Sequence, residues 1–319
     1  MKIAINVAVY NESDHINKLL ESLLVQTKMP DEIIIVDDGS KDDTAKIIKK
    51  FAAENPTIRY LYQKNAGPSA ARNNAWKNSA ADICIFTDGD CVPQKNWIET
   101  MLPYFEDEKV GAVAGTYKTE NDDNLLALFV GYEIAWKYEK LRGPVNVHGT
   151  YNLAVRKKIL EEIGGFNEKF RTAEDADLTY RISEKYTIYF TPESVVGHYH
   201  PEKFWAYMKN QEKRGEDRVL LYKHHPNRIT NDTYTGKIIK YQVLAGGMLI
   251  PSLIFIYPFF KFGFLIPLSI ALFILYCSSF SFPYIAKKNI SCTLYGIPVQ
   301  FFRSIAWFFG LIWGIIKNH

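Results

Sequence analysis

The chain has 319 residues and a formal net charge of +3, with 23% charged and 47% hydrophobic residues. This length suffices for one large domain or two ordinary ones, and a charge so close to balance gives no reason to expect nucleic acid as a partner. The four cysteines show neither metal-ligand spacing nor a framework of pairs, which indicates free thiols in a reducing compartment: Cys84, Cys91, Cys277 and Cys292. The apolar run 3–9 is too short for a signal peptide, so the N-terminal part is expected in the cytosol.

The first part of the chain alternates short apolar strands with amphipathic helices. Strands are expected over residues 3–9, 32–36, 58–62, 83–86 and 110–116, and helices after Ser13 and over 42–53, 69–79 and 125–138. Alternation with short connections predicts an α/β fold with a parallel, doubly wound sheet. Ligands bind such sheets outside the carboxyl ends of the strands. Polar clusters follow three of these strands, at residues 10–12, 37–38 and 88–90.

The sequence Asp88-Gly89-Asp90 comes directly after the fourth expected strand. Gly89 allows the backbone to turn tightly, so both carboxylates can converge on one point. Two hard oxygen ligands so placed suit Mn²⁺ or Mg²⁺, which completes its shell with waters and substrate phosphates. The alternative is a simple turn, since Asp-Gly is a common turn dipeptide. The neighbouring motifs favour the metal site.

Four segments, in this order, resemble glycosyltransferase family 2 and its GT-A fold: Val9-Tyr10-Asn11-Glu12, Val36-Asp37-Asp38-Gly39-Ser40, Ala71-Arg72-Asn73 and Asp88-Gly89-Asp90. The resemblance covers residues 1–215 or so and implies a Rossmann-like mixed sheet. One departure is Ala8, which stands where the family often has proline. We expect this change to affect only the stiffness of the loop.

The resemblance implies a nucleotide-diphosphate sugar as donor, most often a UDP-sugar. Asp37 and Asp38 would accept hydrogen bonds from the base and the ribose, although such a pair also begins helices. Arg72 follows a glycine-containing loop at a helix start and would face an anion, although it could equally be a surface arginine. Asn152, in the segment 149–156, would contact a sugar hydroxyl. The expected donor-binding residues are Tyr10, Glu12, Asp37, Asp38, Arg72, Asp88, Gly89 and Asn152.

A second acidic pair, Glu174-Asp175, follows Gly164-Gly165-Phe166 and resembles the acceptor motif of the family. In that motif the second acid is the catalytic base, because a carboxylate can take the proton of an acceptor hydroxyl. The resemblance therefore assigns Asp175 as the base and Glu174 as a group that orients the acceptor or its neighbours. The alternative is a capping feature at the start of a helix.

His198 follows two short strands expected over 187–190 and 193–196. Some GT-A enzymes have a histidine in this position as an additional metal ligand, and neutral imidazole suits Mn²⁺ better than Mg²⁺. The metal ligands are therefore expected to be Asp88, Asp90 and His198. The alternative is a histidine that is hydrogen-bonded at a strand end.

The last part of the chain is dominated by Phe, Ile, Leu and Tyr. Two segments, 243–260 and 262–286, are long enough to cross a bilayer and predict a transmembrane hairpin, with a buried pair of core helices as the alternative. Lysines on both flanks place both ends on the cytosolic side. A third segment, 293–316, contains Pro298, Gln300 and Arg303 in its first half, which favours a place in the membrane interface over a full span.

Residues 211–214 resemble the Gln-x-x-Arg-Trp motif of processive membrane members of the family. Gly215 occupies the tryptophan position, so processivity is not carried over. The expected domains are a GT-A domain over 1–215, a juxtamembrane linker over 216–242 and a membrane region over 243–319.

These features predict a multi-pass membrane glycosyltransferase with a cytosolic catalytic domain. It would be metal-dependent and inverting, with inversion implied by the resemblance alone. The acceptor would be a hydroxyl on a glycan or on a lipid-linked molecule. Membrane lipid is expected as a partner, because the membrane anchor would hold the site near a lipid-linked acceptor. The alternative is a catalytically silent membrane scaffold that binds nucleotide sugars. The complete set of acids favours the enzyme, because a retired enzyme could lose Asp175.

Overall fold

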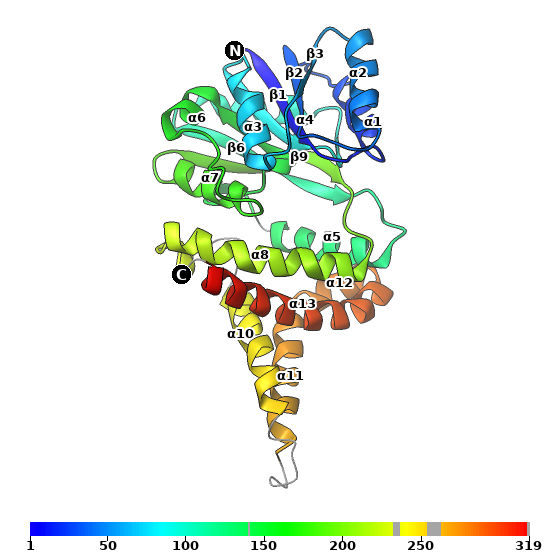
Figure 1. Ribbon diagram of the computed structural model, residues 1–319, viewed down its shortest axis with the longest axis vertical. Helices are drawn as coiled ribbons and strands as arrows, with labels where there is room; N and C mark the ends of the chain where they lie inside the picture. The colour runs from blue at the N-terminus through cyan, green and yellow to red at the C-terminus, as the bar shows by residue number, and fades with distance from the viewer. Residues whose placement is uncertain (140, 232–236, 254–262, 318–319) are drawn as a thin grey trace. The chain divides into compact units, whose positions relative to one another are not determined.

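The computed structural model describes residues 1–139, 141–231, 237–253 and 263–317 (Figure 1). The chain forms two compact units. The sheet unit comprises Met1–Glu120 with Tyr138–Tyr199, and the helical unit comprises Asn121–Lys137 with His200–His319. The expected boundary at residue 215 falls inside helix α8 (Phe204–His224), so residues 216–224 continue a helix instead of forming a linker.

The sheet unit is built on one mixed sheet. Its strands, within the described residues, are β1 (Ile3–Val9), β2 (Glu32–Asp37), β3 (Ile58–Tyr62), β4 (Ile83–Asp88), β5 (Cys91–Pro93), β6 (Val110–Thr119), β7 (Gly143–Val145), β8 (Leu153–Arg156) and β9 (Thr187–His198). The spatial order is β3-β2-β1-β4-β8-β6-β9-β5, and β7 pairs with β9. The first four strands are parallel to one another, whereas β8 is antiparallel to β4 and β6, and β5 is antiparallel to β9. This confirms the predicted α/β class with a mixed sheet.

Helices cover both faces of the sheet, which explains why β1 and β2 are apolar at nearly every position. The helices of the sheet unit are α1 (Ile16–Leu23), α2 (Thr44–Glu54), α3 (Pro68–Lys77), α4 (Trp97–Met101), α6 (Lys157–Ile163) and α7 (Glu174–Ser183), with short 3-10 turns at Leu102–Glu106 and Thr150–Asn152. Ile33 and Ile35 pack on the face covered by α1, α2 and α4, whereas Ile34 and Val36 pack with Ala71 of α3. Successive side chains of a strand point to opposite faces, so one apolar run serves two cores.

Two local predictions differ from the structure. The two strands expected around Pro192 are one strand, β9, whose pairing with β6 shifts register between Gly115 and Thr116. Proline has no N–H for the ladder, so a bulge absorbs it without ending the strand. The N-cap of α1 is His15 rather than Ser13, whose backbone N–H donates to Asp42 at 3.0 Å.

One edge of the sheet collects the polar residues. The parallel strands β1, β2 and β4 end there at Val9, Asp37 and Asp88, and β5 starts there because it runs in the opposite direction. The pairing of β5 with β9 sets Cys91 opposite His198. The chemistry predicted for strand ends is therefore concentrated along this edge.

The helical unit contains α5 (Leu125–Tyr138), α8 (Phe204–His224), α9 (Arg228–Asn231), α10 (Lys237–Ser252), α11 (Leu265–Ser278), α12 (Phe282–Lys288) and α13 (Ile290–Lys317). Figure 1 shows α13 running along α8. Glycines make this contact close: a Cβ at Gly310 would overlap the Glu212 carbonyl, and one at Gly215 would overlap the Trp307 carbonyl. The glycine in the tryptophan position of the processive motif is thus a helix-packing residue here.

A buried ion pair lies inside the helical unit. Both guanidinium Nη atoms of Arg303 in α13 donate to the Glu133 carboxylate of α5, and Gln300 donates to the same carboxylate at 3.3 Å. Burial opposes ionisation of Glu133, but Arg303 more than offsets it and lowers the pKa of this carboxyl to about 2. Arg303 therefore anchors α13 to α5.

Within the described residues, one helix, Ile290–Lys317, is long and apolar enough to cross a membrane. Two further helices, Leu265–Cys277 and Phe282–Lys288, are long and apolar enough only when taken together, and they are bent by 59° relative to each other. Only 28% of the most apolar stretch of Ile290–Lys317 is buried, so it is not an enclosed core helix. The expected hairpin turn lies partly at 254–262, outside the described residues. The length and composition of these helices give weak support for membrane association. They do not support the predicted multi-pass arrangement.

Candidate active site

The Arg72 side chain joins two acidic motifs that are far apart in the sequence. It lies in α3, which starts after Gly67 (φ 95°). Its Nη2 donates to Asp88 Oδ1 at 2.7 Å, and its Nη1 donates to Glu174 Oε1 at 2.7 Å. Arg72 is only 6% exposed, so both bonds are largely shielded from water. The Arg72 guanidinium thus forms ion pairs with a carboxylate at the end of β4 and with another at the start of α7.

Glu174 and Asp175 open α7, where the helix dipole favours negative charge. Burial raises the pKa of Glu174 above its ordinary value, Arg72 opposes this shift, and Asp175 adds to it. Asp175 is only half-buried, and its Oδ1 accepts a hydrogen bond from the Ala176 backbone N–H at 2.6 Å. Glu174 is therefore fixed by Arg72, whereas Asp175 is the member of the pair with accessible surface.

Asn73, next to Arg72, has a role that the sequence did not reveal. Its amide nitrogen donates to the Phe166 carbonyl at 2.9 Å, and its oxygen accepts from the Phe166 N–H at 2.8 Å. Gly165 has a φ of 69°, and a Cβ there would overlap Asn73 and Trp76. Asn73 thus holds the Gly-Gly-Phe turn that precedes α7. The adjacency of Asn73 to Arg72 in the Ala-Arg-Asn motif is the one signal that pointed to it.

Asp37 and Asp38 are buried and bonded to their own chain. Asp37 accepts hydrogen bonds from the Ser40 N–H at 2.8 Å and from the Tyr60 hydroxyl at 2.9 Å. Asp38 accepts from Gln63, Ala66 and Gly67 at 2.7–2.9 Å. Both acids therefore shape the loops at the end of β2 and before α3, and contact with a base or ribose stays a prediction for them.

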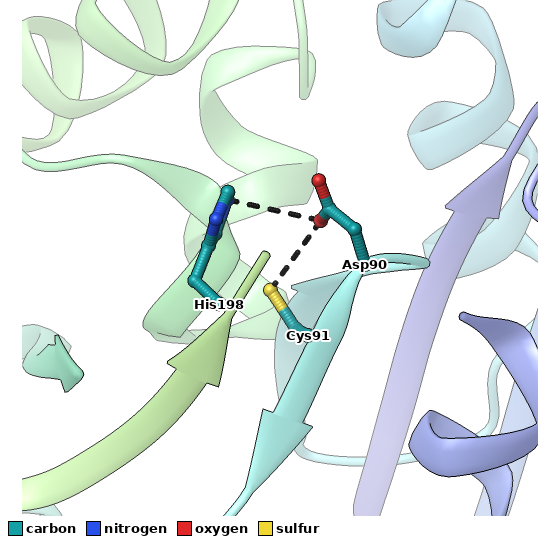
Figure 2. Close-up of side chains that lie close together, drawn as sticks. All are labelled: Asp90, Cys91 and His198. Carbon is teal, nitrogen blue, oxygen red and sulfur yellow. Dashed lines mark hydrogen bonds and ion pairs between the residues drawn. The ribbon is translucent and has the colours of Figure 1, made fainter. Parts of the chain in front are cut away.

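Asp90, Cys91 and His198 lie close together at the polar edge of the sheet, as Figure 2 shows. Asp90 Oδ1 is 3.7 Å from His198 Nε2 and 3.7 Å from Cys91 Sγ. Asp88, in contrast, is bonded to Arg72, and the cluster does not include it. Carboxylate and imidazole together are a donor set that divalent cations accept. These residues therefore fit a divalent cation held by Asp90 and His198.

Glu12 is a further acidic side chain near Asp88 and Asp90 at this edge. Burial and, to a smaller extent, the neighbouring Asp90 and Asp88 carboxylates together raise the pKa of Glu12 to about 8. A Cβ at Gly89 would overlap the Glu12 side chain, so the glycine between the two aspartates makes room for Glu12. Tyr10, two residues earlier in the chain, is exposed. The surplus of carboxylates is a second observation that suits a cation.

Asn152 lies in the core rather than at the polar edge. It is fully buried, and its amide nitrogen donates to the carbonyls of Thr116 and Ser194 at 2.7 and 3.0 Å. Its oxygen accepts from Trp97 at 2.8 Å. These bonds occupy the amide, so this placement does not support the predicted contact with a sugar hydroxyl.

Comparison with known proteins places these residues in a family. The family model described as glycosyl transferase family 2 matches residues 4–164. "Probable glycosyltransferase YdaM" of Bacillus subtilis is 31% identical over 241 residues, which cover 69% of this chain and 56% of that protein. Glycosyltransferase AglE of Haloferax volcanii is 27% identical over 226 residues, with 69% and 74% covered. The chain thus spans little more than half the length of YdaM.

Solved structures share the fold. A mannosyltransferase of Pyrobaculum calidifontis, in complex with GDP-Man and Mn²⁺, superposes with a TM-score of 0.62 over 99% of this chain and 86% of that one, at 18% identity. TarS 1–349 of S. aureus superposes with a TM-score of 0.54 over 96% and 90%, at 16% identity. The sheet, the ordered motifs and the matched family model agree. The chain belongs to glycosyl transferase family 2.

Proposed function

We propose that this protein transfers a sugar from a nucleotide-diphosphate sugar to an acceptor hydroxyl, with inversion at the anomeric carbon, in a metal-dependent reaction at a membrane surface. The observation that carries the proposal is the bridge from Arg72 to both Asp88 and Glu174. It connects the strand-end acids, where the donor diphosphate would sit, to the acid pair that would meet the acceptor.

On the donor side, Asp90 and His198 would hold the cation, and Asp88 would join them if Arg72 turned its Nη2 toward a phosphate. A bound Mn²⁺ or Mg²⁺ would offset the charge that grows on the departing diphosphate. Arg72 has donors for both a carboxylate and a phosphate, and its planar fork suits either anion. This exchange of partners would couple donor binding to the position of the acid pair.

On the acceptor side, Asp175 would accept the proton of the hydroxyl as the new C–O bond forms. Its half-buried position and its place next to the Arg72-bound Glu174 support this role. Glu174 would act as the positioning residue, because its carboxylate is fixed from the buried side. A single in-line displacement with one base gives inversion of the anomeric carbon.

Relatives and structural neighbours support the donor class without fixing the nucleotide. The Pyrobaculum structure holds GDP-Man, GalNAc-T7 holds UDP, GalNAc and Mn²⁺, and a Staphylococcus aureus relative is named poly-beta-1,6-N-acetyl-D-glucosamine synthase. A UDP-sugar donor and a glycan or lipid-linked acceptor are the versions we propose for this chain.

We further propose that the helical unit attaches the protein to membrane lipid, with the sheet unit in the cytosol. Helix α13 packs on α8, and α8 contains charged residues along its length, so α13 cannot cross the hydrocarbon without taking those charges with it. This favours an interfacial α13. Apolar side chains are exposed on α11 and α13, including Leu268, Leu272, Phe273, Phe309, Ile312 and Trp313.

The experiment that tests the function is a donor screen with the purified full chain. UDP-, GDP- and dTDP-sugars would be supplied with Mn²⁺, Mg²⁺ or a chelator, and transfer or hydrolysis of each donor would be measured. Metal-dependent turnover of one donor supports the enzyme. Nucleotide binding without turnover of any donor would instead support the alternative, a silent scaffold.

A further inference from the structure

The cluster at the polar edge contains a thiol as well as hard ligands. Cys91 is the first residue of β5 and pairs directly with His198, the last residue of β9. Directly paired residues of antiparallel strands project their side chains to the same face of the sheet. Asp90 immediately precedes Cys91, and Figure 2 shows the three side chains converging.

The distances within the cluster approach those of a coordination site. Asp90 Oδ1 lies 3.7 Å from both Cys91 Sγ and His198 Nε2, and all three ligand atoms lie within 4.8 Å of one another. A tetrahedral zinc site with bonds of about 2.0–2.3 Å separates its ligand atoms by about 3.3–3.8 Å. Small side-chain movements would therefore suffice to close the three residues on one ion.

We propose that Asp90, Cys91 and His198 form a site for a thiophilic divalent cation, Zn²⁺ or Cd²⁺, with Cys91 Sγ as a direct ligand. When the ion binds, the sulfur–metal bond forms as the thiol proton passes to solvent. Soft thiolate with imidazole selects such ions, whereas Mg²⁺ prefers oxygen alone. Asp88 stays with Arg72, so the site draws only Asp90 and His198 from the proposed catalytic set.

For the transfer reaction, the site predicts competition between metal ions. This inhibition rests on the proposed function, whereas the metal site itself does not. A thiophilic ion held by Cys91 would occupy Asp90 and His198 and exclude the catalytic Mn²⁺. Low concentrations of Zn²⁺ or Cd²⁺ should therefore inhibit the wild-type protein in the presence of excess Mn²⁺. This inhibition follows from the position of the Cys91 thiol and does not require bound donor.

The binding test uses the reduced, metal-free full chain and no donor. Titration with Cd²⁺ should produce the ultraviolet charge-transfer absorption of a thiolate–cadmium bond with one ion per chain. Cys91→Ser and Cys91→Ala should both abolish the absorption and weaken Cd²⁺ binding by at least about tenfold, since loss of even an outer-shell partner has an effect of that order. His198→Gln should also weaken binding. Cys84→Ser, at another buried cysteine of the sheet unit, is the matched control and should leave the absorption unchanged.

Absence of the absorption in the wild type, or its persistence in both Cys91 variants, would overturn the site. Circular dichroism would show whether each Cys91 variant folds. If one of them does not fold, the other still tests the site. The two proposals also fail separately. Cadmium absorption without turnover of any donor would refute the transferase and leave the site, whereas metal-dependent turnover without cadmium absorption would refute the site alone.

Discussion

Arg72 donates a hydrogen bond of 2.7 Å to Glu174, a residue 102 positions away in the sequence. The same guanidinium holds Asp88 at 2.7 Å. Two acidic motifs that are far apart in the sequence therefore share one guanidinium.

Replacing Arg72 with methionine should destabilise the sheet unit by about 3–5 kcal/mol, because it leaves the buried Glu174 carboxylate without its counterion. Urea unfolding followed by tryptophan fluorescence would measure the change. Arg59→Met is the control: the exposed Arg59 side chain pairs with Glu32 near the surface, so its loss should change stability by no more than about 1 kcal/mol. Equal effects of the two substitutions would contradict the importance of the bridge.

Asp175→Asn should reduce transfer by a factor on the order of 10²–10⁴ and leave nucleotide affinity nearly unchanged, because the amide keeps the shape but cannot accept a proton. Glu174→Gln should reduce transfer less. Calorimetry with UDP beside transfer rates would measure both quantities. If Asp175→Asn also lost UDP binding, the carboxylate would be a donor ligand or a structural group. If Glu174→Gln were the less active variant, the two roles would be reversed.

Asp90→Ala should abolish metal-dependent turnover and leave the fold intact, because Asp90 is partly exposed and contributes little packing. Transfer rates would be measured against Mn²⁺ concentration, with circular dichroism as the check on folding. Asp43→Ala, at an exposed acid outside the cluster, is the control and should keep wild-type behaviour. Wild-type turnover and metal dependence in Asp90→Ala would show that the metal site lies elsewhere.

Glu12→Gln should stabilise the metal-free protein at high pH. The pKa of Glu12 is raised to about 8 by burial and by Asp90 and Asp88, so folding favours the protonated acid. Below pH 4.5 the acid is protonated in both states and has no effect on stability. As pH rises from 4.5 to 8 the unfolded state ionises first, and the wild type loses stability progressively.

Unfolding free energies at pH 4 and pH 9 would test this prediction. The variant should gain more than about 1 kcal/mol over the wild type at pH 9 and nothing at pH 4, since one pKa unit is worth about 1.4 kcal/mol. Saturating Mn²⁺ should shrink the gain, because the cation stabilises ionised Glu12. Glu21→Gln, at an exposed position of α1, should show no such pH dependence. A gain that is equal at both pH values would rule out the proton as its cause.

Gly215→Trp should separate α8 from α13, because even a Cβ at this position overlaps the Trp307 carbonyl. The expected result is a loss of protection from amide exchange along α13 and a lower unfolding temperature. Lys213→Trp places the same side chain on the exposed face of α8 and should be neutral. Unchanged exchange in Gly215→Trp would show that the two helices do not depend on this contact.

The sequence alone determined the first three strands of the sheet and the order of the motifs that follow the strands. The runs 3–9, 32–36 and 58–62 are strands at or within one residue of those limits, because strands buried on both faces are continuous apolar runs and are hard to mistake. The motifs also identified the family, since their order along the chain is much more specific than any one of them.

Tertiary structure decided which side chains meet. That Arg72 bonds Glu174, that Cys91 stands opposite His198 and that Asn152 is enclosed in the core all depend on contacts between distant segments. The extent of α8 beyond residue 215 depends on its packing against α13, whose glycines look like neutral spacers in the sequence. Local periodicity encodes which face of an element is buried, but only the packed fold determines which partner it meets there.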